Sequence, residues 1–246
     1  MIQSIRKAFD VLEHLAGVDP AAGGATLSEV AERLGDRPST ARNILKTMEG
    51  RGYVARADGR RYVLGPRCAG LTQSAGLARW RHAAPEALRT LAEATGEAAL
   101  LAALVDADRR VVCRVAGGGV VSVDAGRAEE KPFWGLVTAR AMAAQVPPEA
   151  LDSIVGRHGL PGRWWGGIRS RRKLNEALSA IRKAGHAADV DGRDIGSLAV
   201  AIESTDGTVG AVGLYFPIYR YDRTKRKAWL SALKKAAKRI GDCHAR

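Results

Sequence analysis

The first 66 residues constrain the fold most strongly, because signals for three successive helices occur there at short intervals. A first helix is predicted over residues 4–16, before a loop rich in glycine, alanine and proline. Its expected apolar stripe consists of Ile5, Phe9, Leu12 and Leu15. A short second helix is predicted to begin at Thr26, because Thr26 and Glu29 have the T-x-x-E spacing in which each side chain hydrogen-bonds a free backbone N–H. Gly35 is expected to end this helix.

The third predicted helix, residues 38–51, has an apolar stripe and a polar face on opposite sides. Pro38 suits the first helical position, and Gly52 closes the helix. The stripe has the spacing i, i+3, i+4, i+7 and consists of Ala41, Ile44, Leu45 and Met48. At about 100° per residue, the opposite side collects Ser39, Arg42, Asn43 and Lys46. One side is therefore expected to pack against the protein while the other faces outward.

Two short strands, residues 53–56 and 61–64, are predicted after the third helix. Asp58 and Gly59 between them are a strong signal for a tight turn, so the strands are expected to pair as a hairpin. Three helices followed by a hairpin is the order of elements in a winged helix-turn-helix.

The outward face of the third helix carries side chains that can read DNA in the major groove. Arginine matches guanine with two N–H groups, and asparagine matches adenine in the same bidentate manner. Arg37 and Thr40 lie at the N-terminal end, where free N–H groups attract phosphate. An arginine-bearing hairpin suits the minor groove or the flanking backbone. The residues expected to contact DNA are Arg37, Ser39, Thr40, Arg42, Asn43, Lys46, Arg56, Arg60 and Arg61.

A solvated helix face is the alternative to a face that reads DNA. Solvated faces more often alternate charge signs, whereas Glu49 is the only acidic residue on this helix. Residues 37–61 contain seven Lys or Arg and two Asp or Glu. This local excess, together with the order of the elements, favours DNA binding.

The net charge of +13 and the pI of about 10.2 also favour a polyanionic partner, because Lys and Arg near phosphates release condensed counterions. Most of the excess lies elsewhere, since residues 216–246 contain ten Lys or Arg against two Asp. A helix is predicted over residues 223–240 with the apolar stripe Trp229, Leu230, Leu233, Ala237 and Ile240. Its basic side chains either add nonspecific DNA contacts or form a solvated face, and the stripe opposite them favours the solvated face.

Helices and strands interleave after residue 66. Further helices are predicted over residues 70–81, 85–95, 136–145, 148–157 and 173–184. Strands are predicted over residues 97–105, 110–116, 120–124, 197–204 and 208–216. Turns at residues 106–108 and 206–207 join the first and the last pair into hairpins. Hairpins imply an antiparallel sheet with helices packed on it, so the expected fold class is α+β.

Both halves of the sequence resemble the IclR family of transcriptional regulators. In the first half, the matching segments are SIRKAFDVL (4–12), LSEVA (27–31), PSTAR (38–42), MEGRGYV (48–54) and YVLG (62–65). In the second half, they are residues 132–135, 139–141, 158–161, 174–185, 189–196 and 208–212, with Pro217 and Arg220. The resemblance implies a winged helix-turn-helix domain over residues 1–66, a linker helix over residues 67–84, and an antiparallel-sheet domain with flanking helices, for effector binding and oligomerisation, over residues 85–246. It also implies a homodimer or a dimer of dimers on a palindromic double-stranded DNA operator, acting as repressor or activator.

The resemblance further implies a pocket for a small organic effector, a carboxylate or an aromatic molecule. Val137 and Thr138 match loop-to-helix positions whose backbone amides face the ligand in similar proteins, and Trp134 lies just ahead of them. Asp189 matches an acidic pocket position, and two positions of the following strand match the pocket floor. The expected effector-binding residues are Trp134, Val137, Thr138, Asp189, Ser197 and Ala199.

Several residues depart from the family's pattern at this pocket. Trp134 stands where histidine is usual, and Arg140 where lysine is usual. Ala199 replaces a common cysteine, and Glu203 falls where proline is typical. Trp134 either fills part of the cavity, stacks on an aromatic ligand or belongs to the core. A C-terminal domain that only oligomerises and has lost ligand binding is therefore the alternative.

An enzyme is not expected, because the sequence contains no GxSxG, HExxH or P-loop motif and no GxGxxG after a strand. Asp189, Asp191 and Asp194 fit a polar loop better than a metal loop, because their spacing is irregular and no glutamate follows. The three cysteines lack CxxC spacing, so neither a zinc site nor a disulfide is expected. No cofactor is predicted.

A cytoplasmic protein without membrane spans is expected, because the longest apolar run, residues 98–105, is far too short to cross a bilayer and the start does not resemble a signal peptide. A nonspecific, nucleoid-type DNA binder is a further hypothesis. It predicts equal affinity for random and operator DNA, whereas a specific regulator should bind its operator about 10³-fold or more tightly.

Overall fold

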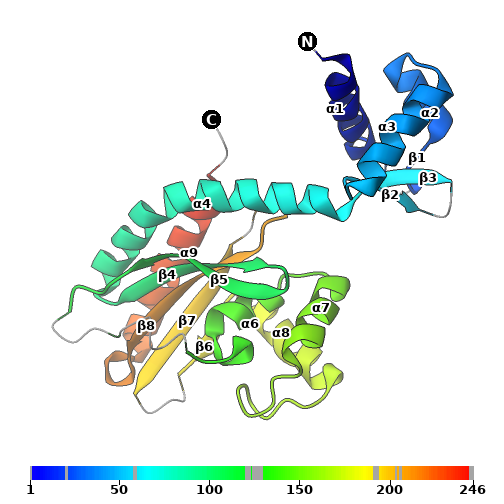
Figure 1. Cartoon of the computed structure of the whole chain (residues 1–246). Coiled ribbons are helices and arrows are strands. Elements are labelled where there is room, and N and C mark those ends of the chain that lie inside the picture. Colours follow the sequence, from blue (N-terminus) through cyan, green and yellow to red (C-terminus); the bar gives the residue numbers. More distant parts are fainter. Residues whose placement is uncertain are drawn as a thin grey trace. The chain divides into compact units, whose positions relative to one another are not determined.

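The computed structural model of the chain separates into two compact units, Met1–Ser74 and Ala75–Arg246 (Figure 1). The structure describes residues 2–19, 22–57, 60–119, 123, 130–190, 194–202, 204 and 207–243.

The first unit has the element order of a winged helix-turn-helix. Its helices are α1 (Gln3–Ala16), α2 (Leu27–Leu34) and α3 (Pro38–Gly50). Its strands are β1 (Ala25–Thr26), β2 (Val54–Ala57) and β3 (Arg61–Leu64), which form an antiparallel sheet in the order β1-β3-β2. The predicted hairpin is the β2–β3 pair, while its turn at Asp58 and Gly59 lies outside the described residues. The two-residue strand β1 was not expected from the sequence.

Local signals set the ends of α2 and α3. The backbone N–H of Glu29 donates to Thr26 Oγ1 at 3.3 Å, and the backbone N–H of Thr26 donates to Glu29 Oε2 at 2.6 Å, which confirms the predicted capping box. Gly35 ends α2 in the left-handed conformation with φ of 62°. Pro38 opens α3, as its missing N–H allows.

The predicted apolar stripe of α1 is wrong in part. Ile5 and Phe9 are 52% and 60% exposed, whereas Val11 and Leu15 are buried in the core of the unit. The helix carries apolar residues on two neighbouring stripes, and α2 and α3 cover only the one that contains Val11 and Leu15. Tertiary packing therefore selects a stripe that periodicity alone does not distinguish.

The second unit is built on a five-stranded antiparallel sheet in the order β5-β4-β8-β7-β6. The strands are β4 (Ala98–Val105), β5 (Asp108–Val115), β6 (Ala187–Asp189), β7 (Ile195–Ile202) and β8 (Gly210–Pro217). Two predicted hairpins, β4–β5 and β7–β8, are confirmed, whereas β6 was not expected as a strand. The strand predicted at residues 120–124 lies outside the described residues, apart from Val123.

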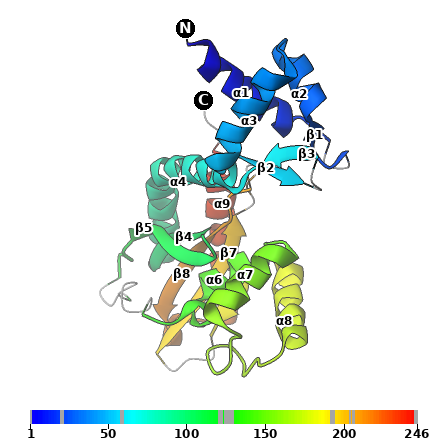
Figure 2. The same ribbon diagram turned by 45° about the vertical axis from the view of Figure 1, so that its right-hand side comes forward.

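Helices cover both faces of this sheet (Figures 1 and 2). On one face lie the short helix η2 (Phe133–Gly135) and the helices α6 (Val137–Ala143), α7 (Pro148–His158) and α8 (Arg171–Ala184). On the other face lie two helices, α4 (Pro66–Thr95) and α9 (Arg223–Gly241). Only the part of α4 from Ala75 onward belongs to the second unit. The residues of β4 alternate between the two cores: Leu100 packs toward α6, whereas Leu101 packs toward α4 and α9. The apolar run 98–105 is therefore a strand that is buried on both faces.

The prediction of two separate helices between residues 70 and 95 is wrong. Two helices were predicted over residues 70–81 and 85–95, but the chain forms one helix, Pro66–Thr95, with Pro85 inside it. A proline removes one helical hydrogen bond and normally breaks a helix. Here Trp80, Ala84 and Leu88, on either side of Pro85, are all buried in one core, and this packing holds the helix together.

Candidate DNA-binding surface and effector site

The orientation of α3 is fixed by its buried side. Ala41 and Leu45 are fully buried and Met48 is 7% exposed, all in the core shared with α1 and α2. The side chains on the opposite side are exposed, as periodicity predicts, and they are Ser39, Arg42, Asn43 and Lys46. The structure thus brings four of the residues expected to contact DNA together on one outward face.

The basic side chains of this face are available to a ligand. Within the residues that the structure describes, neither Arg42 nor Lys46 forms an ion pair. Arg37 is exposed at the N-cap position of α3, where its side chain makes no capping bond. Thr40 is half-buried one turn further on. An exposed, unpaired cationic face beside a helix N-terminus suits phosphate and base edges.

The hairpin arginines differ from one another. Arg56 Nε lies 3.3 Å from Oε1 of Glu49 on α3, and the Arg56 guanidinium lies 5.0 Å from the centroid of the Tyr62 ring. Arg61 donates to the carbonyl oxygen of Gly24 at 2.7 Å, and so ties β3 to the chain before α2. Arg60 is exposed. Two of the three arginines therefore also stabilise the unit, a role that the sequence did not reveal.

Thr47 and Arg51 are also exposed at α3, although neither is among the expected DNA contacts. Thr47 follows Asn43 by one helical turn, and its hydroxyl donates to the carbonyl oxygen of Asn43 at 2.9 Å. Arg51 is the exposed C-cap residue of α3. The i, i+4 spacing from Asn43 was the signal that could have found Thr47.

The six expected effector residues do not surround one open space. Thr138 and Ala199 are fully buried, and Thr138 Oγ1 accepts a hydrogen bond from Arg109 Nε at 2.6 Å. Val137 is 1% and Ser197 8% exposed. The polar groups of this region are mostly committed to partners within the protein.

Trp134 lies in the core. The residue is only 2% exposed, and its indole Nε1 donates a hydrogen bond to the carbonyl oxygen of Gly159 at 2.8 Å. The edge of the Trp134 ring meets Phe133 at a centroid distance of 5.1 Å, and Trp165 stacks beside it at 6.2 Å. Of the roles open to it, the structure favours the core tryptophan.

Arg140 and Asp189 form a largely buried pair behind this region. Arg140 is 4% exposed, and its Nη2 lies 3.5 Å from Asp189 Oδ2. The same guanidinium donates to the carbonyl oxygens of Trp134 and Trp164 and lies over the ring of Trp165. Burial lowers the pKa of Arg140, while the Asp189 carboxylate opposes that effect. Asp189 is thus engaged by Arg140 and, at 3.9 Å, by Lys131.

A small cavity adjoins this pair. Its volume is about 20 Å³, close to the space that a single water molecule needs. Val137 and Ser197 are the expected effector residues that line it, and Lys131 and Tyr215 add polar groups that the sequence did not single out. The full lining is Lys131, Gly135, Leu136, Val137, Ile195, Ser197 and Tyr215.

The described part of the chain contains neither a metal-binding cluster nor a membrane-spanning helix. There, no group of three or more His, Cys, Asp and Glu side chains could hold a metal ion. Of Asp189, Asp191 and Asp194, Asp191 lies outside the described residues. No described helix combines the length and the apolar character needed for a transmembrane span.

Sequence models of known families match both units. The model of the IclR helix-turn-helix domain matches residues 4–58, and the model of the C-terminal domain of bacterial transcriptional regulators of the IclR type matches residues 74–242. The chain is 24% identical to the transcriptional repressor IclR of Escherichia coli strain K12 over 249 residues, which covers 97% of this chain and 89% of that protein.

Solved structures share the fold. A transcriptional regulator of the IclR family from Rhodococcus sp. has a TM-score of 0.65 at 21% identity, with 98% of this chain and 92% of that chain covered. An IclR homologue from Microbacterium hydrocarbonoxydans, crystallised in complex with 4-hydroxybenzoate, has a TM-score of 0.55 at 22% identity, with 97% of both chains covered.

Proposed function

The chain belongs to the IclR family of DNA-binding transcriptional regulators, and we propose that it recognises a specific operator through the exposed side of α3. The observation that carries this proposal is the pairing of two features in one helix. The buried stripe around Leu45 fixes the orientation of α3, and Arg42, Asn43 and Lys46 project from the other side without ion pairs among the described residues.

Each residue of this side has a chemical role in the proposal. Arg42 presents two N–H groups to O6 and N7 of guanine, and Asn43 presents its amide to N6 and N7 of adenine. Lys46 neutralises a phosphate, and Arg37, Ser39 and Thr40 bind the backbone at the start of the helix. Arg60 enters the flanking minor groove from the hairpin, with Arg56 and Arg61 beside it.

A palindromic operator and a homodimer or dimer of dimers are part of the proposal. A single recognition helix contacts few base pairs, and two-fold symmetric proteins of this class bind half-sites about one helical turn apart. Two copies of α3 would then read the two halves of a palindrome.

We further propose that a small organic carboxylate modulates DNA binding from the second unit. Lys131, Ser197 and Tyr215 line the same small cavity and offer an ammonium group and two hydroxyls to a carboxylate. Asp189 holds Lys131 at this position. Trp134 and Thr138 are buried and directly adjoin the lining residues Gly135 and Val137 in the sequence, so they would support the cavity wall, and Ala199 would belong to the buried sheet nearby. A ligand larger than water must enlarge the cavity, so binding would be coupled to movement of its walls.

The alternative is a second unit that only oligomerises. The cavity volume of about 20 Å³ and the core position of Trp134 favour it. Aromatic acids belong in the test, because 4-hydroxybenzoate is bound by the homologue from Microbacterium hydrocarbonoxydans.

Selection of bound sequences from random duplex DNA tests the DNA-binding proposal and yields the operator. The expected result is one enriched palindrome; a pool that stays random contradicts operator recognition. Calorimetric titration with a panel of small aliphatic and aromatic acids then tests the effector. Saturable binding that is weakened by Lys131→Gln, but not by Lys183→Gln on α8, supports the carboxylate site. An absence of binding across the panel supports the domain that only oligomerises.

A further inference from the structure

The helix α9 carries an unusual concentration of positive charge. Arg223–Gly241 contains eight Lys or Arg and no acidic residue. All eight basic residues are exposed, whereas Trp229, Leu233 and Ile240 bury the other side of the helix in the core. The apolar stripe expected from the sequence is confirmed, and the remaining charge faces away from it.

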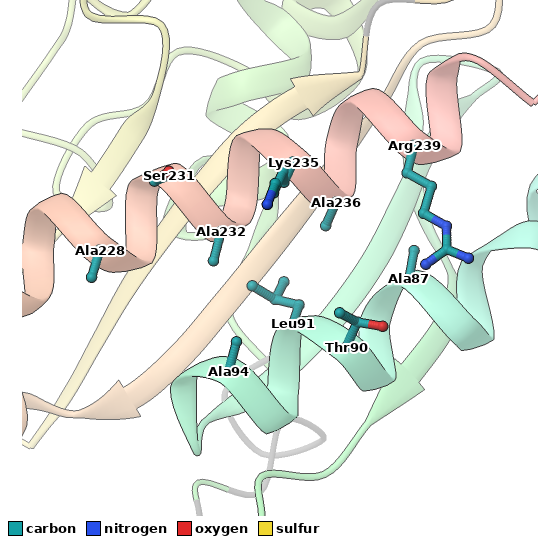
Figure 3. Close-up of a pocket in the computed structure, with 10 residues that line it drawn as sticks. All are labelled: Ala87, Thr90, Leu91, Ala94, Ala228, Ser231, Ala232, Lys235, Ala236 and Arg239. Atoms are coloured by element: carbon teal, nitrogen blue, oxygen red, sulfur yellow. The ribbon is translucent and has the colours of Figure 1, made fainter.

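This helix stands between two hollows of the second unit. A hollow of about 530 Å³ separates it from α4, and Figure 3 shows Ala228, Ala232 and Ala236 pointing across that hollow. A hollow of about 520 Å³ lies on its other side, against α6, α8 and β7. The exposed side of α9 therefore forms a raised ridge between them. This α9 ridge consists of Lys227, Ser231, Lys234, Lys235, Lys238 and Arg239.

Basic side chains flank the ridge on both sides. Lys235 and Arg239 border the hollow toward α4 (Figure 3), and Lys234 and Lys238 border the hollow toward α8. Between them the exposed surface carries the small residue Ser231. The exposed side of α9 thus presents two neighbouring rows of cations, which lie about 100° apart around the helix axis.

Internal carboxylates neutralise this charge only in part. Lys238 pairs with Asp242 at 3.0 Å and Arg239 with Glu86 at 2.6 Å, and both pairs are exposed. Among the residues that the structure describes, Lys227, Lys234 and Lys235 form no ion pair. Exposed pairs are weak and give way to competing phosphates. The unpaired lysines of the ridge can therefore neutralise phosphates and release the counterions condensed on DNA.

We propose that the α9 ridge is a second DNA-binding surface, which contacts the phosphates of a duplex without reading its sequence. The major groove is about 12 Å wide and admits a helix, so the two rows of cations, which diverge by about 100° from the exposed side of α9, can point toward the two bordering strands. Lys227 and Lys234 are both exposed and lie two helical turns apart along the same side of α9. Release of condensed counterions supplies the binding free energy.

The residues of the ridge favour nonspecific contact with DNA over base readout and over binding to a membrane. Between its two rows of cations the ridge has Ser231, where base readout would need arginine, asparagine or glutamine. A membrane-binding helix inserts its apolar face, but the apolar face of α9 is buried in the protein. DNA that is held by the first unit is also present at high effective concentration for the second unit of the same molecule.

The salt dependence of affinity for a long duplex of random sequence tests this inference. The test variant is the full-length protein with Lys227, Lys234, Lys235 and Lys238 all replaced by Gln. The matched control removes four exposed cations from α8 and the loop before it, namely Arg163, Arg169, Lys173 and Lys183, also by replacement with Gln. A charge-preserving variant replaces the four ridge lysines by Arg. Circular dichroism confirms that all three are folded.

The expected result is a loss in the slope of log affinity against log salt of about 0.9 for every phosphate contact removed, hence between about 2 and 4 for the test variant. The slopes of the control and of the Arg variant should differ from the wild-type slope by no more than about 0.9, the value for one phosphate contact. Equal losses in the test variant and the control overturn the proposal, because they show a general effect of net charge. Unchanged affinity for DNA combined with lost binding to anionic phospholipid vesicles overturns it in favour of a membrane surface.

This inference goes beyond operator recognition and can fail separately from it. The ratio of operator to random affinity should be the same in wild type and in the ridge variant, because α3 supplies that ratio. A ridge variant that loses the ratio while keeping the salt slope contradicts the assignment of α9 as a nonspecific contact.

Discussion

Arg140 Nε donates to the carbonyl oxygen of Trp134 at 2.7 Å in a part of the second unit where both residues are almost fully buried. The same guanidinium donates to the carbonyl oxygen of Trp164 at 2.9 Å and pairs with Asp189. One side chain therefore joins η2, the loop before α8 and β6.

Replacing Arg140 by Met should destabilise the second unit by about 2–4 kcal/mol, because one buried carbonyl oxygen, one partly buried carbonyl oxygen and one half-buried carboxylate lose a partner. Arg140→Lys should recover part of the loss, since an ammonium group keeps the charge near Asp189 but cannot reach both carbonyls in the fork geometry. Urea denaturation of the three proteins measures the difference. A Met variant as stable as wild type would show that the guanidinium has no structural role.

Thr26→Ala should lower the free energy of unfolding of the first unit by about 1 kcal/mol, because the N-cap hydroxyl accepts the backbone N–H of Glu29. Thr47→Ala is the matched control in the same unit. Thr47 lies exposed inside α3, where alanine is the better helix former. Thermal melting should therefore show a lower Tm for the first variant and an unchanged or higher Tm for the second. Equal shifts would contradict a role for the cap.

The capping box should also make stability depend on pH. The hydrogen bond from the Thr26 backbone lowers the pKa of Glu29, with a further contribution from Arg61. A lowered folded-state pKa means that the ionised carboxylate stabilises the fold above the ordinary value of about 4.3 and that this contribution is lost as pH falls through the folded pKa. The difference in Tm between wild type and Glu29→Gln should therefore be constant near neutral pH and vanish in acid. A difference that grows in acid would have the wrong sign.

Two glycines of the second unit should respond in opposite directions to alanine. A Cβ at Gly210 would lie 2.4 Å from the Trp80 ring, so Gly210→Ala should cost about 1–3 kcal/mol. Gly156 lies inside α7 with open space around its Cβ position, so Gly156→Ala should add about 0.5–1 kcal/mol. Chemical denaturation of both variants checks the pair. A stabilising change at Gly210 would mean that α4 does not pack on β8 through Trp80.

The parts of the fold that short-range signals determine could be predicted from the sequence. Thr26, Gly35 and Pro38 act within one helical turn, and each ends or begins a helix where expected. The outward side of α3 could also be predicted, because a single apolar stripe around Leu45 leaves no choice of orientation.

The parts that depend on distant partners could not be predicted. Phe9 lies on a stripe of α1 that no other element of its unit covers. Pro85 remains inside a helix because the core around Leu88 holds both halves. Arg61 serves the fold by binding Gly24, a contact between residues 37 positions apart. The interior around the expected effector residues depends on the contact between Arg140 and Trp165, which are 25 positions apart in the sequence.

The most direct test of the account is the ratio of affinities for the selected operator and for random DNA, measured at one fixed salt concentration. Wild type should show a ratio of about 10³ or more. Arg42→Ala and Asn43→Ala should each lower it by about tenfold or more, since a bidentate base contact contributes about 1–3 kcal/mol of discrimination. Arg169→Ala and Asn175→Ala, which change the same residue types at exposed positions of the second unit, should leave the ratio unchanged. An undiminished ratio in both α3 variants would contradict the assignment of this helix as the element that reads the operator.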